Sequence, residues 1–188
     1  MPVEIEAKMA VEDLDSVRAR LTELGAKRLG NYLETNIFFD QEDRSLLAAD
    51  KGLRLRVKHD MDSGEDTHIL TFKGPRHPGP LKSREEVELM VEGRAEAVKL
   101  LECLGYCQML SFEKRRESFS IESCEVELDE MPLLGTYVEV EGPSEEAVMH
   151  VRQLLGLSDR PLIRAGYVSM LSSYLQERGK PQREIRFS

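Results

Sequence analysis

Ionised side chains alternate with apolar side chains along six segments of the chain. Side chains two residues apart point to the same face of a β-strand, so each segment would carry one charged face and one apolar face. The charged rows are Glu4, Glu6 and Lys8; Arg54, Arg56 and Lys58; Lys82, Arg84, Glu86 and Glu88; Lys114 and Arg116; Glu125, Glu127 and Asp129; and Glu139 and Glu141. Some rows carry one sign only, since Arg54 and Arg56 are cations whereas Glu139 and Glu141 are anions. Like charges on one strand face do not stabilise each other, so these rows favour a bound ligand of opposite charge.

Two arrangements of the strands account for charged rows of this kind. In an open sheet, the apolar face packs on helices and the charged face meets water. In a closed antiparallel barrel, the charged faces turn inward and helices cover the apolar outside. Such an interior has to be hydrated and to bind ions, because unpaired buried charge is very costly. Solvent faces usually carry Thr, Ser and Gln as well, so the nearly pure charge of these rows favours the barrel.

A barrel interior lined by both signs of charge would suit one class of ligand. Arginine binds phosphate oxygens in bidentate geometry. Carboxylates hold Mg²⁺ or Mn²⁺, and these cations bridge to phosphates. The rows therefore predict a site for a phosphate-rich anion together with a divalent metal.

The charged rows lie on a chain that alternates between extended and helical segments. Extended or alternating residues predict strands at 2–9, 27–40, 53–58, 68–73, 82–91, 109–121, 125–129 and 137–141. Apolar residues at helical spacing predict helices that end near Gly25, Gly105 and Gly156, and a fourth helix that begins at Pro161. Loops are predicted at residues 40–49 and 74–80. We expect one α+β domain over residues 1–178 and a loose tail over residues 179–188.

Composition limits the class of protein and of partner. The 188 residues carry 26 Lys and Arg against 35 Asp and Glu, a net charge of −9, which argues against general binding of nucleic acid. No apolar run is long enough to span a membrane, and the first residues lack the pattern of a signal peptide. Three cysteines without paired metal spacing indicate free thiols in a reducing compartment. We therefore expect a cytoplasmic protein that binds a small anion in a locally basic pocket.

Six short motifs follow one another in a definite order along the chain. They are EIEAK at residues 4–8, LRLR at 53–56, TFKGP at 71–75, REEVE at 84–88, EKRR at 113–116, and LD at 128–129 followed by LGTYVEVE at 134–141. In sequence and order they resemble the CYTH superfamily, the triphosphate tunnel metalloenzymes. The resemblance covers residues 2–175 and implies an eight-stranded antiparallel tunnel with helices on its outside.

The resemblance also implies a role for each residue that matches a motif. Metal ligands would be Glu4, Glu6, Glu139 and Glu141. The triphosphate would be bound by Lys8, Arg54, Arg56, Lys73, Arg84, Lys114 and Arg116, with Arg164 as a further candidate cation. Catalytic roles would fall to Asp129, Lys8 and Arg56, with Asp129 near the reacting phosphate. In the C-terminal helix the family carries a Ser-Tyr pair, whereas this chain has Gly166 before Tyr167.

Three functions fit the same tunnel. The hairpin motif and the chain length look most like the class IV adenylyl cyclase branch, which converts ATP to cyclic AMP and pyrophosphate. A triphosphatase acting on tripolyphosphate, thiamine triphosphate or a nucleoside triphosphate would use the same residues. A third possibility is a module that binds polyphosphate or nucleotide without turnover, although such a module would have no need of metal carboxylates. Dimers occur among relatives, so a homodimer is a further expectation.

Overall fold

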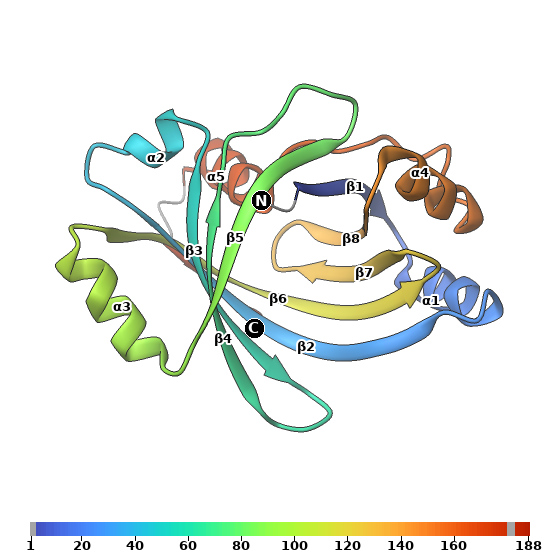
Figure 1. Ribbon diagram of the computed structural model, residues 1–188, viewed down its shortest axis with the longest axis horizontal. Helices are drawn as coiled ribbons and strands as arrows, with labels where there is room; N and C mark the ends of the chain where they lie inside the picture. Colours follow the sequence, from blue (N-terminus) through green and yellow to red (C-terminus); the bar gives the residue numbers. More distant parts are fainter. Residues whose placement is uncertain (1–2, 180–182) are drawn as a thin grey trace.

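Eight strands form a closed antiparallel barrel in the computed structural model, which describes residues 3–179 and 183–188. The strands are β1 (Val3–Val11), β2 (Lys27–Asp40), β3 (Gly52–Asp60), β4 (Asp66–Lys73), β5 (Lys82–Val91), β6 (Cys107–Ile121), β7 (Cys124–Met131) and β8 (Gly135–Gly142). Their order is β2-β3-β4-β5-β1-β8-β7-β6, and pairing of β2 with β6 closes the barrel (Figure 1). The expected antiparallel barrel is confirmed.

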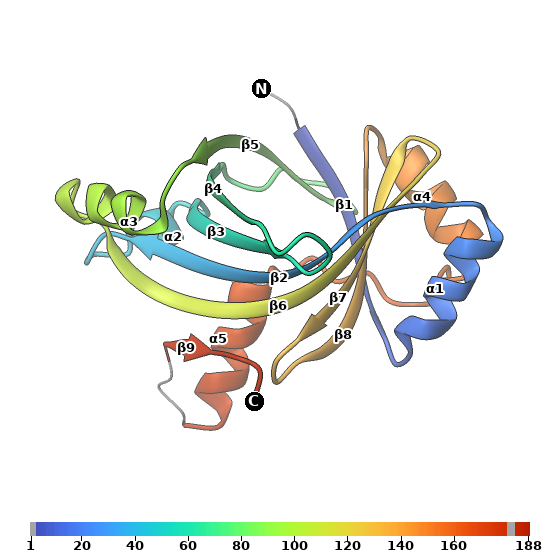
Figure 2. The same ribbon diagram turned by 90° about the horizontal axis from the view of Figure 1, so that it is seen from below.

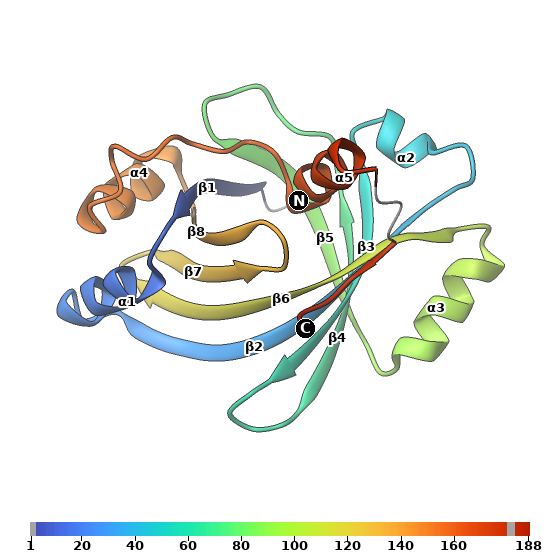
Figure 3. The same ribbon diagram turned by 180° about the vertical axis from the view of Figure 1, so that it is seen from behind.

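Helices pack against this barrel, most of them on its outside as expected, but the last one packs against inner-face residues of β6, β7 and β8 at one end. They are α1 (Leu14–Glu23), α2 (Ser45–Ala48), α3 (Arg94–Cys103), α4 (Glu145–Leu154) and α5 (Tyr167–Glu177). Figure 2 shows α1 and α4 together beside β1, β7 and β8, with α3 at the opposite end of the molecule. Figure 3 shows α5 from behind. Among the described residues, no helix has the length and apolar character needed to cross a membrane.

The apolar faces of the strands pack against these helices. Met9, Val126 and Val138 belong to a buried cluster with Leu21 of α1 and Val151 of α4. A second cluster joins α3 to the outer faces of β2 and β3, and a third joins α5 to β6 and to the β7–β8 turn. The outer apolar faces are therefore covered by α1, α3 and α4, and α5 covers apolar residues of the inner face at one end, which leaves the rest of the inside for the charged rows.

The sequence placed most helix ends correctly, with one clear exception. The Ser144 hydroxyl accepts a hydrogen bond from Ala147 N and caps α4. The fourth predicted helix does not begin at Pro161, because α5 starts six residues later at Tyr167. Between them the chain is drawn along β1, where Ile163 N donates to Lys8 O at 2.8 Å. The backbone of residues 161–166 is therefore not helical, and within it the N–H of Ile163 bonds to β1.

The end of the chain also differs from expectation. Residues Glu184–Ile185 form β9, which pairs in parallel with β6. Ile185 is 3% exposed and packs in the apolar cluster around α5. Phe187 N donates to a carboxylate oxygen of Glu113 at 3.0 Å. Residues 183–188 of the predicted loose tail therefore pack on the barrel, because the side chain of Ile185 is buried in this cluster. Residues 180–182 lie outside the described part of the structure.

We expect replacement of Ile185 by Ala to lower the free energy of unfolding by about 2 kcal/mol, because the change leaves a cavity in this cluster. Urea unfolding followed by circular dichroism measures the loss. The matched control is R186A, which changes an exposed neighbour and should shift stability by less than about 0.5 kcal/mol. Equal midpoints for the two variants would show that β9 adds nothing to stability.

Candidate active site in the barrel interior

The charged rows point into the barrel. Lys8 is 2% exposed, Arg116 6%, Asp129 0% and Glu139 8%, although all four side chains carry ionisable groups. On β1, β7 and β8 the alternate residues Met9, Val126 and Val138 are apolar and pack outward against α1 and α4. The open-sheet alternative is therefore wrong, and the rows form the inner wall of the barrel.

The register of the strands decides which charged residues face one another. Lys8 lies opposite Glu139 across β1 and β8, and Glu139 lies opposite Glu127 across β8 and β7. Arg116 lies opposite Asp129 across β6 and β7. Opposite residues share a face of the sheet and are close neighbours. Four strands thus bring both signs of charge to one part of the wall.

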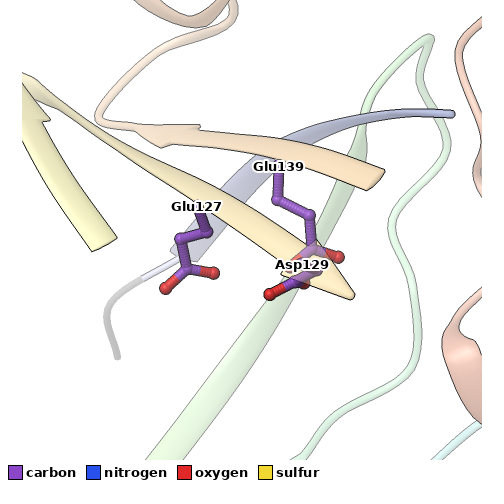
Figure 4. Close-up of side chains that lie close together, drawn as sticks. All are labelled: Glu127, Asp129 and Glu139. Atoms are coloured by element: carbon purple, nitrogen blue, oxygen red, sulfur yellow. The ribbon is translucent and has the colours of Figure 1, made fainter. Parts of the chain in front are cut away.

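Three carboxylates from β7 and β8 form what we call the acidic cluster: Glu127, Asp129 and Glu139. Figure 4 shows them on the same side of the hairpin. One oxygen of each lies within 4.8 Å of the others. Arg116 contacts all three, with its Nε donating to Asp129 Oδ1 at 2.6 Å and its terminal nitrogens paired with Glu127 and Glu139. A single guanidinium therefore neutralises part of a strongly negative site.

Lys8 links the acidic cluster to the first strand. Its Nζ lies 3.0 Å from Glu139 Oε1 and 3.5 Å from Glu6 Oε1, and it donates to Ala165 O at 3.2 Å. Glu6 also pairs with Lys82 of β5. Glu6 and Glu139, two of the predicted metal ligands, are thus brought together through Lys8.

Glu34 of β2, which belongs to none of the charged rows or motifs, lies among the predicted phosphate-binding cations. It is fully buried, with Oε1 3.5 Å from Arg56 and Oε2 3.3 Å from Lys114 Nζ. Lys114 Nζ also donates to Asp129 Oδ2 at 3.4 Å. Burial raises the pKa of Glu34, but Arg56 and Lys114 more than offset it and hold that pKa well below its usual range. An ionised Glu34 therefore separates the cation rows from one another.

Several arginines of the inner wall carry buried N–H groups that make no hydrogen bond among the described residues. Arg54 donates to Thr71 Oγ1 at 3.2 Å and lies 3.5 Å from Glu88. Burial and the nearby Arg56 lower the pKa of Arg54 to about 10, so it stays charged at neutral pH. Nε atoms of Arg54, Arg56 and Arg84 are buried and find no hydrogen-bond partner among the described residues. Buried donors without partners are costly, and an anion inside the barrel would satisfy them.

Burial and neighbouring charge push the carboxylates of the acidic cluster in different directions. Burial raises the pKa of Glu139, but Lys8 and Arg116 together hold it well below its ordinary value. Burial raises the pKa of Glu127 to about 7, although Arg116 lowers it in part. The cluster therefore combines a permanently ionised group with one that titrates near neutral pH.

Tyr167, the first residue of α5, reaches the same site, and the sequence analysis gave it no role. Its hydroxyl donates to Asp129 Oδ2 at 2.9 Å. Lys8 Nζ lies 4.0 Å from the centre of its ring. Burial first, and the charge of Asp129 second, raise the pKa of Tyr167 well above its usual value, so the hydroxyl keeps its proton.

The remaining predicted residues fall in different places. Lys73 pairs with Glu86 on the neighbouring strand. Glu141 is half-buried and lies opposite Glu6 in the ladder. Arg164 does not join the buried cations, because its side chain is exposed and donates to the backbone oxygen of His77 at 3.5 Å. The side chain of Glu4 lies outside the described part of the structure.

The donor set of this site fits a hard divalent cation. The acidic cluster supplies oxygen ligands from three side chains in close proximity. Glu6 Oε1 is also buried and has no hydrogen-bond partner among the described residues. Carboxylate oxygens are the ligands that Mg²⁺ and Mn²⁺ prefer. Glu139 is the residue common to the cluster and to the set of metal ligands predicted from sequence.

Known proteins share both the sequence and the architecture. Residues 2–167 match the CYTH domain family. A protein of Methanocaldococcus jannaschii named "Putative adenylate cyclase MJ0240" is 27% identical over 177 residues, which cover 89% of this chain and 98% of that protein. The structure of PH1819 from Pyrococcus horikoshii has a TM-score of 0.79 at 26% identity and covers 90% of this chain and 98% of its own.

A plant protein shares the fold at lower identity. The structure of HpAC1 from Hippeastrum, described with a dominant triphosphatase activity, has a TM-score of 0.65 at 19% identity and covers 96% of this chain and 97% of its own. The barrel, its charged interior and a family match that extends over most of the sequence lead to one conclusion. This chain belongs to the CYTH domain family.

Proposed function

We propose that this chain is a metal-dependent enzyme that acts on a triphosphate, with conversion of ATP to cyclic AMP and pyrophosphate as the first candidate reaction. One observation carries the proposal. Buried arginine donors without partners and a buried acidic cluster line the same barrel interior. A polyphosphate would satisfy the donors, and a divalent cation would satisfy the carboxylates.

Each group in the wall would have a distinct task. Arg54, Arg56 and Lys114 would bind phosphate oxygens, while Lys8 and Arg116 would balance charge near the acidic cluster. Bound Mg²⁺ or Mn²⁺, with Glu139 among its ligands, would supply Lewis-acid charge to the phosphates. Asp129 would lie beside the reacting phosphorus and orient the attacking hydroxyl. Phosphoryl chemistry depends mainly on such alignment and charge balance.

Two reactions fit this arrangement, and they differ in the phosphorus that faces the nucleophile. In a cyclase, the 3′ hydroxyl of the nucleotide attacks the α-phosphorus and pyrophosphate leaves. In a triphosphatase, water attacks the terminal phosphorus, the diphosphate is the leaving group, and the attacked phosphorus is released as orthophosphate. The adenylate cyclase name of the archaeal relative supports the first reaction, and the triphosphatase activity described for the plant protein keeps the second in consideration.

Product analysis decides between these functions. The protein is incubated with ATP, tripolyphosphate and thiamine triphosphate, each with Mg²⁺ or Mn²⁺, and the products are separated by chromatography. Cyclic AMP with pyrophosphate supports the cyclase, and orthophosphate without cyclic AMP supports the triphosphatase. If all three substrates bind and none is converted to product, the chain is a binding module, and the proposal that it is an enzyme is refuted.

The proposal extends to the partners of the protein. The substrate would be a free small molecule in the cytoplasm, and the net charge of −9 argues against nucleic acid as a partner. We also propose a homodimer, which sedimentation analysis can test.

We expect the R56A variant to raise KM for the triphosphate about 10- to 100-fold while kcat changes less, since a hydrogen bond to a charged group is worth roughly 1.5–3 kcal/mol. Steady-state kinetics at saturating metal measures both constants. The control is R115A, which removes a cation from the outer face of β6, where Arg115 pairs with Glu130. Unchanged KM and kcat in R56A would count against a role for Arg56 in binding.

A further inference from the structure

The segment that leads into α5 is bound to the centre of the inner wall at three points. Ile163 N donates to the backbone oxygen of Lys8 at 2.8 Å, and Lys8 Nζ donates to Ala165 O at 3.2 Å. Two residues further on, the Tyr167 hydroxyl donates to Asp129 Oδ2 at 2.9 Å. The helix that packs against the inner face at one end of the barrel thus places one polar atom beside the acidic cluster.

Tyr167 contacts two groups of the site, Lys8 through its ring and Asp129 through its hydroxyl. Its ring faces Lys8, with Nζ 4.0 Å from the ring centre, a distance typical of a cation–π contact. Its hydroxyl is one of several donors to Asp129, whose other donors are Arg116 and Lys114. The ring contact orients the cation, and the hydroxyl fixes the carboxylate.

A purely structural role would leave the hydroxyl unexplained. The ring packs edge to face on Tyr137, with centroids 5.4 Å apart, and both rings lie in the apolar cluster around α5. The Tyr137 hydroxyl donates to a backbone oxygen, that of Leu134, at 3.1 Å. Packing alone would be served equally well by Phe at position 167, whereas the hydrogen bond to a fully buried Asp129 needs the phenol.

We propose that Tyr167 is a positioning residue, which acts through its hydroxyl on Asp129 and sets the orientation of that carboxylate for turnover. This inference rests on the proposed function of the site. Groups that orient a ligand from behind typically contribute about 10- to 100-fold to metal affinity or to activity.

The test compares Y167F with Y137F. Each change removes one hydroxyl from the same aromatic pair, but only Y167F removes a donor to Asp129. We expect Y167F to lower kcat about 10-fold with KM within about 2-fold of wild type, and Y137F to leave both unchanged. Titration of Mn²⁺ into metal-free protein, followed by calorimetry, gives a readout without turnover. There Y167F should weaken binding about 10-fold and Y137F should not.

A double-mutant cycle shows whether Tyr167 acts through Asp129. In the D129N background, addition of Y167F should change kcat by less than about 2-fold, because the partner of the hydroxyl has already been altered. The inference is overturned if Y167F behaves like Y137F, or if its full effect persists beside D129N. Absence of product from wild-type protein would refute the proposed function instead, and the Mn²⁺ titration would still decide the role of Tyr167.

Discussion

Replacement of Glu139 by Gln should lower metal-dependent turnover of a triphosphate by at least about 100-fold, with the fold intact. Glu139 is a member of the acidic cluster and contacts both Lys8 and Arg116. Those cations hold its pKa well below the ordinary value, so Glu139 is ionised at neutral pH. Glutamine keeps the shape of the side chain and removes that charge.

The measurement is initial rate as a function of Mn²⁺ concentration at saturating substrate. We expect the metal concentration for half-maximal rate to rise in E139Q, since one anionic ligand has been lost. The matched control is E130Q, on the outward side of β7, where Glu130 pairs with the half-exposed Arg115 at 3.0 Å. An exposed ion pair of this kind contributes little. If E139Q kept the wild-type rate and metal dependence, Glu139 would not be a metal ligand.

The charged rows could be placed correctly from the sequence because a strand has a period of two. Once Val138 and Val140 were assigned to the apolar face, Glu139 and Glu141 had to lie on the other face. The structure adds that the charged face is the inner one. Strand bounds followed from the same pattern, and β5 spans Lys82–Val91 as predicted.

Glu34 was missed because its row does not consist of charge. The inner row of β2 runs through Tyr32, Glu34, Asn36 and Phe38. Because aromatic residues flank the two polar ones, this row does not stand out as charged in the sequence. A signal was nevertheless present, since two polar residues, Glu34 and Asn36, are two residues apart and share one face of the strand. Period alone gives the face of a side chain and says nothing about its partner. The partners of Glu34 follow from the register of β2 with β3 and β6.

Tyr167 shows a second limit of sequence patterns. It stands at helical spacing with Leu171 and Leu175, and all three are buried in one apolar cluster. Helical spacing with two leucines accords with the burial of the ring. The contact of its hydroxyl with Asp129 depends on how α5 docks on the barrel, and helical spacing carries no information on docking.

The largest expected loss of stability comes from replacement of Arg116 by Met. Arg116 is 6% exposed and pairs with all three carboxylates of the acidic cluster. Its removal leaves three clustered carboxylates, two of them buried, with Lys8 and Lys114 as the cations in contact with Glu139 and Asp129. Loss of one partner from a buried ionic network typically costs about 3–5 kcal/mol. At about 2–4 °C per kcal/mol for a chain of this size, Tm should fall by roughly 10 °C.

The exposed neighbour on the same strand supplies the control for this loss. R115M breaks one pair with Glu130 on the outer face, and both side chains there are about half exposed. It should cost less than about 1 kcal/mol. Equal Tm values for R116M and R115M would mean that the interior is hydrated well enough to stabilise the carboxylates without Arg116.

The pH dependence of R116M follows from the charges that remain. Burial already raises the pKa of Glu127 to about 7, with Arg116 as the main group that lowers it, so removal of Arg116 should raise that pKa further. A carboxyl whose pKa is higher in the folded than in the unfolded state stabilises the fold at low pH. That contribution is lost as pH rises through the folded pKa. The deficit of R116M relative to wild type should therefore grow between about pH 6 and pH 8.

A divalent cation should stabilise the folded state of R116M, as protonation of the carboxylates does. It binds the folded state and supplies the positive charge that the carboxylates have lost, so it raises stability by mass action. We therefore expect Mn²⁺ to raise the Tm of R116M by more than that of wild type, in which Arg116 competes for the same oxygens. A Tm of R116M that does not respond to Mn²⁺ would mean that these carboxylates do not bind metal, and Arg116 would then be a structural counter-ion alone.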